Sequence, residues 1–144
     1  MIKELEKFEI EQVMDIWLNT NITAHNFLPK KYWVNNYDLV KEQYIPMAKN
    51  FVYKEDGIIK GFISIIEDSF IGALFVSEKY QGQGIGKKLI NHCKSLYDNL
   101  QLAVYSNNTP AVNFYKHCGF IIEKEQKNVD SDFMECIMSW SEVK

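Results

Sequence analysis

The chain has few cysteines, few prolines and no long apolar run. Its three cysteines (Cys93, Cys118 and Cys136) are an odd set without metal-ligand spacing, so free thiols in a reducing compartment are the simplest interpretation. No apolar stretch approaches the roughly 18 residues that a membrane-spanning helix needs, and the N-terminus carries no basic-then-apolar signal. We therefore expect a soluble, cytoplasmic protein with no bound metal and no membrane partner.

The chain also has no large excess of positive or negative charge. Sixteen Lys and Arg oppose 19 Asp and Glu, giving a net charge of −3, and no basic run is longer than two residues. This balance argues against nucleic acid as the main partner. With 144 residues, 47% of them apolar, and no repeat or low-complexity linker, we expect one domain over residues 1–144, as a monomer or homodimer.

Hydrophobic periodicity and turn residues predict alternating strands and helices. The Asp56-Gly57 pair predicts a tight hairpin, and Asn108 followed by Thr109-Pro110 predicts a helix start. The predicted order is β-α-α-β-β-β-α-β-α-β-β, which is a mixed, mostly antiparallel α/β (α+β) sheet flanked by helices. The expected strands are 3–8, 50–54, 58–66, 71–76, 100–105, 120–124 and 133–140. Helices are expected from about 10, from about 29, from the end of the glycine turn to about 97, and from about 109.

A glycine-rich turn between a strand and a helix is the most informative segment. Gly82, Gly84 and Gly86 leave main-chain N–H groups unshielded at a helix N-terminus, and Lys87 and Lys88 add positive charge, so the turn should hold a phosphorylated ligand. The spacing G-x-G-x-G does not match the dinucleotide fingerprint G-x-G-x-x-G. A P-loop is excluded because Gln81 and Lys88 stand where it needs a glycine and a Ser or Thr.

Two motifs in this order resemble the GNAT superfamily of N-acetyltransferases. The first is Gln81-x-x-Gly84-x-Gly86, similar to that family's pyrophosphate loop. The second is Asn108-x-x-Ala111-x-x-x-Tyr115-x-x-x-Gly119-Phe120. The resemblance implies the GNAT fold and acetyl-CoA as cosubstrate. It also implies direct transfer of the acetyl group to a primary amine in a ternary complex, without an acyl-enzyme.

The resemblance also assigns roles to individual residues. Main-chain N–H groups at Phe75 and Val76 would hold the thioester and its developing oxyanion, and Tyr115 would protonate the leaving thiolate. Tyr115 as a core aromatic, Asn108 as a helix cap and Asn113 on a solvated face are the competing interpretations. The residues expected to bind the cofactor are Phe75, Val76, Gln81, Gly82, Gln83, Gly84, Ile85, Gly86, Lys87, Lys88, Asn108 and Asn113.

The acceptor side is less defined by the sequence. The expected pocket residues are His25, Phe27, Trp33, Glu67 and Phe70. The general base is left open between His25, Glu67 and a water relay, against a structural histidine and a surface carboxylate. The acceptor itself is a protein lysine, a peptide N-terminus or a small amine.

Two rival functions use the same features. A non-catalytic acyl-CoA-binding module would share the fold, although it has no need for the proton donor that Tyr115 offers. A nucleotide-binding protein would use the glycine turn alone.

Overall fold

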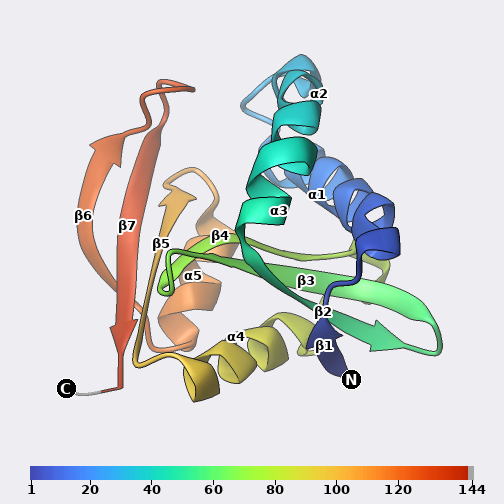
Figure 1. The fold of residues 1–144 in the computed structure, drawn as a ribbon. Helices are drawn as coiled ribbons and strands as arrows, with labels where there is room; N and C mark the ends of the chain where they lie inside the picture. Colours follow the sequence, from blue (N-terminus) through green and yellow to red (C-terminus); the bar gives the residue numbers. More distant parts are fainter. Residues whose placement is uncertain (143–144) are drawn as a thin grey trace.

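The computed structural model describes residues 1–142, in which seven strands form one sheet with helices on both faces (Figure 1). The strand order is β1-β2-β3-β4-β5-β7-β6, and only the β4–β5 pair is parallel. This confirms the predicted mixed α/β class. The strands are β1 (Ile2–Glu4), β2 (Lys49–Glu55), β3 (Ile58–Ile66), β4 (Phe70–Val76), β5 (Asn99–Tyr105), β6 (Ile121–Lys127) and β7 (Met134–Ser141). The helices are α1 (Ile10–Ala24), α2 (Lys30–Leu39), α3 (Ile45–Met47), α4 (Ile85–Leu96) and α5 (Thr109–His117), with short turns η1 (Lys7–Glu9), η2 (Val40–Tyr44, a π-helix) and η3 (Glu78–Tyr80).

Most predicted elements are confirmed, and the first strand is the main exception. The sequence predicts a strand over 3–8, but β1 ends at Glu4 and η1 leads directly into α1. The physical reason is a capping box in which the Glu6 N–H donates to Glu9 Oε1 at 3.0 Å. The Glu9 carboxylate is fully buried and receives the Lys54 ammonium at 2.6 Å, so this turn is fixed by a contact distant in sequence.

The sheet has an apolar core on each face. Alternation along β3 sends Phe62 to the α1–α2 face and Ile63 to the α4–α5 face, and both side chains are fully buried. Figure 1 shows α1, α2 and α3 on one side of β2–β4 and α4 on the other. These two cores hold the sheet between its helices.

The two central strands separate after a short contact. The β4–β5 pairing consists of Phe70 with Gln101 and Ile71 with Leu102, and the register continues no further. From Gly72 onward, the edge of β4 that faces β5 has no strand partner. The N-termini of α4 and α5 follow the C-terminal ends of these same two strands. The sheet is therefore open next to the glycine turn that follows β4 and the Asn108 motif that follows β5.

Two properties of the described residues concern possible membrane and metal partners. Within residues 1–142, no helix combines the length and apolarity needed to cross a membrane. The same part of the chain holds no group of three or more His, Cys, Asp or Glu side chains placed to bind a metal ion.

Candidate active site

The glycine turn borders a cleft of about 610 Å³, the turn cleft, between β4, α4 and α5. Most of the residues expected to bind the cofactor line it. These are Phe75, Val76, Gln81, Gly82, Gly84, Ile85, Gly86, Lys87 and Asn108, with Tyr115 beside them. Seven further residues line the cleft although the sequence did not indicate them as cofactor-binding, and of these only Ala111 is a fixed position of a motif: Thr20, Ala24, Leu74, Tyr80, Pro110, Ala111 and Phe114.

Backbone geometry explains the glycines of the turn. Gly82 and Gly84 have φ of +80° and +82°, a left-handed conformation that strains other residues, and a Cβ there would meet nothing within 4 Å. Gly86 has a packing role instead, since a Cβ there would lie 3.1 Å from Phe114 Cζ and Phe114 would have to shift. Gln81 Nε2 donates to the Val76 carbonyl at 2.9 Å and ties the turn to β4. The turn thus presents the N-terminus of α4 to the cleft with no side chain on Gly84.

Three residues expected to bind the cofactor lie outside the residues that line the turn cleft. The Lys88 ammonium lies 5.5 Å from the Tyr53 ring centroid, on the β2 side of α4, because one residue after Lys87 the helix has turned by about 100°. Gln83 and Asn113 are exposed side chains that do not line the cleft. Asn113 lies on a solvated face of α5, which was the competing interpretation.

A second hollow of about 220 Å³, the central cavity, lies where β4 and β5 separate. It is lined by residues of both strands and of α1, α2 and α5: Trp17, Asn21, His25, Trp33, Ile71, Gly72, Ala73, Leu74, Phe75, Leu102, Ala103, Val104, Tyr105, Asn108, Ala111 and Tyr115. Leu74, Phe75, Asn108, Ala111 and Tyr115 also line the turn cleft. The two hollows therefore meet around Phe75 and Tyr115.

Tyr115 stands at that junction as a protonated hydroxyl. Its side chain is buried against Phe114 and Phe120, with ring centroids 5.3 and 5.7 Å away. Burial raises the pKa of Tyr115, so the hydroxyl keeps its proton at neutral pH. Within residues 1–142 the hydroxyl makes no hydrogen bond. It is thus available to a ligand bound in either hollow.

His25 is held by two asparagines inside the central cavity. Its Nδ1 lies 3.0 Å from Asn21 Oδ1, and its Nε2 lies 3.0 Å from Asn108 Nδ2. Asn21 Nδ2 donates to the Trp17 carbonyl, which leaves Asn21 Oδ1 as the acceptor. The proton is therefore on Nδ1, and Nε2 accepts from Asn108. Burial lowers the pKa of His25 to about 4, so both ring nitrogens are engaged in a neutral ring.

The other expected acceptor residues divide into two groups. Trp33 is buried and lines the central cavity, and its Nε1 is a buried donor without a partner in the described chain. Phe27 packs beside that wall, 5.7 Å from the His25 ring and 5.3 Å from Tyr105.

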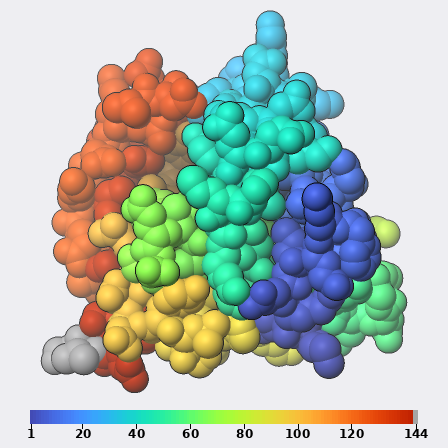
Figure 2. Space-filling view, in the orientation of Figure 1, coloured from blue at the N-terminus to red at the C-terminus, as the bar shows by residue number. Residues whose placement is uncertain are grey.

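Glu67 and Phe70 do not line the cavity. Glu67 is exposed in the β3–β4 turn with φ of +53°, and the space-filling view shows this turn, in light green, on the surface (Figure 2). Phe70 lies at the paired end of β4, opposite Gln101. Both residues lie at or before the start of β4, whereas Phe75 lies near its other end. Glu67 therefore occupies the position of a surface carboxylate, which was the competing interpretation.

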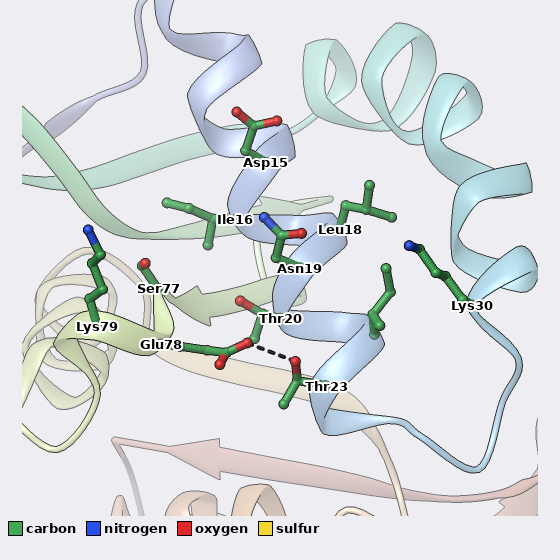
Figure 3. A pocket seen from close by; sticks show the side chains of 11 residues that line it. Asp15, Ile16, Leu18, Asn19, Thr20, Thr23, Lys30, Ser77, Glu78 and Lys79 are labelled. Atoms are coloured by element: carbon green, nitrogen blue, oxygen red, sulfur yellow. Dashed lines mark hydrogen bonds between the residues drawn. The ribbon is translucent and has the colours of Figure 1, made fainter.

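Helix α1 contributes more to the site than its sequence indicated. Thr20 is 8% exposed, lines the turn cleft, and also lines a neighbouring groove of about 530 Å³ between α1 and residues 77–79 (Figure 3). In that groove Thr23 Oγ1 donates to Glu78 Oε1 at 2.7 Å and ties α1 to the segment after β4 (Figure 3). The helical pattern of α1 gave no signal for this, because it identifies only the face that packs in the core.

The comparisons with known proteins agree with this geometry. Residues 18–136 match the acetyltransferase (GNAT) domain family. The chain is 36% identical over 143 residues to the peptidyl-lysine N-acetyltransferase YiaC of Escherichia coli K12, covering 99% of this chain and 98% of that one. The solution structure of apo YjaB from Escherichia coli superposes with a TM-score of 0.85 at 26% identity, over 97% and 96% of the two chains.

A solved complex with coenzyme A has the same fold. The PaiA N-acetyltransferase of Thermoplasma acidophilum, in complex with coenzyme A, has a TM-score of 0.81 at 18% identity, over 98% of each chain. The motifs, the fold and the full-length similarity agree with one another. The chain belongs to the GNAT acetyltransferase family and is an N-acetyltransferase, an enzyme that transfers an acetyl group to an amine.

Proposed function

We propose that the chain transfers the acetyl group of acetyl-CoA to the ε-amine of lysine in proteins or peptides. One observation carries the choice of acceptor: none of the residues lining the central cavity is an Asp or Glu. A polyamine brings several ammonium groups, and burying them without carboxylates is costly. A lysine brings one amine on an apolar stem, which suits this lining. The similarity to a peptidyl-lysine acetyltransferase over the full chain supports the same acceptor.

The donor fits the turn cleft. The pyrophosphate of acetyl-CoA would lie against the main-chain N–H groups of the glycine turn, with Lys87 beside it. Its pantetheine arm would run along the edge of β4 that β5 leaves unpaired, where main-chain groups are available for hydrogen bonds. This path brings the thioester to Phe75 and Tyr115, at the junction of the two hollows.

The chemistry at the junction is direct attack in a ternary complex. The neutral acceptor nitrogen bonds to the acetyl carbon, and main-chain N–H groups of β4 stabilise the oxyanion. The carbon–sulfur bond then breaks, Tyr115 gives its proton to the leaving thiolate, and the hydrogen that the nitrogen loses as the amide forms restores the Tyr115 hydroxyl. The raised pKa of Tyr115 keeps that proton available. An acyl-cysteine is disfavoured because all three cysteines are buried, and burial raises the pKa of Cys93 to about 12.

Steady-state kinetics with two acceptors tests this proposal. We expect a lysine peptide to give a higher kcat/KM than spermidine, with one free thiol released for each acetyl-lysine formed. A higher kcat/KM for spermidine would contradict the choice of acceptor. If acetyl-CoA raised the melting temperature but no thiol appeared with any amine, the chain would act as a binding module instead.

A further inference from the structure

Acetyl transfer to an ammonium needs a proton acceptor that the central cavity does not supply directly. Its lining holds no carboxylate, and both ring nitrogens of His25 are already in hydrogen bonds. The amine attacks only after losing a proton. The proton therefore leaves the cavity through water or through another side chain, and the remaining side chain with an ionisable hydroxyl in the lining, besides Tyr115, is Tyr105.

Tyr105, at the end of β5, connects the cavity to the β6–β7 loop. Its ring is held by His25 and Phe27, with centroids 5.2 and 5.3 Å away. Its hydroxyl donates to Ser131 Oγ at 2.9 Å, and the Tyr105 side chain lies near enough to Tyr32 to raise the pKa of Tyr32. Tyr32 in turn donates to Asp130 Oδ2 at 2.6 Å. These groups form a path from the cavity wall to an exposed carboxylate.

The far end of this path is held in place by its own loop. Asn128 Oδ1 accepts from the main-chain N–H groups of Asp130 and Ser131, both at 2.9 Å. Asn128 Nδ2 donates to the buried Glu135 at 2.9 Å, which anchors the loop to β7. Phe133 packs on Phe27 with ring centroids 4.9 Å apart. Asp130 is thus positioned against Tyr32 although its side chain faces solvent.

We propose that the hydroxyls of Tyr105 and Tyr32 carry the proton of the acceptor ammonium from the central cavity to the Asp130 carboxylate. The inference rests on acetyl transfer to an ammonium acceptor in this cavity. The ammonium N–H bond breaks as the Tyr105 oxygen takes the proton, and Tyr105 passes its own hydroxyl hydrogen to the Tyr32 oxygen. Tyr32 passes its hydrogen to Asp130 Oδ2, and the resulting carboxylic acid releases the proton to solvent. Both tyrosines end as neutral hydroxyls.

The environment of Tyr32 suits a hydroxyl that passes a hydrogen on and stays neutral, rather than a tyrosinate that acts as a base. Burial raises the pKa of Tyr32, and the hydrogen bond to Asp130 and the neighbouring Tyr105 raise it further. A tyrosinate is therefore disfavoured, and a hydroxyl that receives one hydrogen as it gives up another never carries a negative charge. The Tyr105 hydroxyl turns from Ser131 to Tyr32 for this step, a rotation about its C–O bond.

The experiment compares two acceptors on the same enzyme preparation. One is a lysine peptide, and the other is the same peptide with an aminooxy group in place of the ε-amine, which is neutral at pH 7 and has no ammonium proton to lose. For Tyr105→Phe, Tyr32→Phe and Asp130→Asn we expect the lysine-to-aminooxy ratio of kcat/KM to fall at least about tenfold, the low end of what a positioned proton-transfer group contributes. Asp132→Asn, an exposed carboxylate in the same loop, is the matched control and should keep the wild-type ratio.

The ratio stays informative when a variant is poorly folded, because loss of folded enzyme lowers both activities equally. An unchanged ratio in the three variants would overturn the relay and leave these residues a purely structural role. If the wild type acetylates neither peptide, the lysine proposal fails, and the same ratio is taken with a small alkylamine and its aminooxy counterpart. The relay and the acceptor are therefore tested separately.

Discussion

Asn108 Nδ2 lies 3.0 Å from His25 Nε2 and joins the N-terminus of α5 to the end of α1 across the central cavity. Asn108 Oδ1 meanwhile accepts the Ala111 N–H at 3.3 Å, as the N-cap of the helix that carries Tyr115. One side chain thus caps α5 and fixes its distance from α1. His25 belongs to this scaffold as a neutral acceptor, which is a positioning role.

Stability should depend on pH through His25. Its folded-state pKa of about 4 lies below the ordinary 6.5, so between these values the unfolded chain binds more protons. The free energy of unfolding should therefore be highest above pH 6.5, where the ring is neutral in both states, and should fall as the pH falls from 6.5 through 4. The total loss should be roughly 3 kcal/mol. Urea unfolding across this range should show the loss, and His25→Gln should flatten the slope. An equally steep slope in His25→Gln would assign it to other groups.

Asn108→Asp should shift the protonation of His25. A carboxylate still accepts the Ala111 N–H as an N-cap, but it has no hydrogen to donate to Nε2. It favours the imidazolium instead, so the pKa of His25 should rise above its wild-type value. NMR titration of the His25 ring signal, assigned with His25→Gln, measures this directly. An unchanged titration would show that Asn108 and His25 are not coupled in solution.

Tyr115→Phe should separate chemistry from cofactor binding. The ring packing on Phe114 and Phe120 is retained, while the proton for the thiolate is lost. We expect kcat to fall by about 10²-fold, with the Kd for coenzyme A nearly unchanged by calorimetry. Tyr44→Phe, an exposed tyrosine outside both hollows, is the control. Wild-type turnover in Tyr115→Phe would remove this residue from the acid role.

Gly84→Glu should abolish coenzyme A binding by placing a carboxylate where the pyrophosphate would lie. Backbone strain alone is controlled by Gly57→Glu, since Gly57 has φ of +79° and open space around a Cβ, as Gly84 does. Each substitution should cost about 1 kcal/mol of stability, measured by chemical unfolding. Only Gly84→Glu should lose the rise in melting temperature that coenzyme A gives. A similar loss in Gly57→Glu would mean that strain, and not the added charge, prevents binding.

The sequence indicated the donor side of the site better than the acceptor side. The glycine turn and the segment from Asn108 to Phe120 are local patterns. Backbone geometry and helix capping restrict which residue types occur at closely spaced positions, so such patterns can be recognised in the sequence. The contacts of His25 with Asn108 and of Tyr32 with Asp130 join residues far apart in the sequence, and no local periodicity predicts them. Glu67 is an example from the acceptor side. It is close to β4 in the sequence, but it precedes the start of the strand, whereas Phe75 and the central site lie towards the other end.

The most direct test of the central claim is mass spectrometry of a single turnover with excess enzyme, acetyl-CoA and a lysine peptide. We expect the peptide to gain one acetyl group on its ε-amine while an equal amount of free coenzyme A thiol appears. The enzyme mass should stay unchanged at every time point. An acetylated enzyme that forms before the product, or a peptide that stays unmodified while acetyl-CoA remains bound, would contradict direct transfer at the junction of the turn cleft and the central cavity.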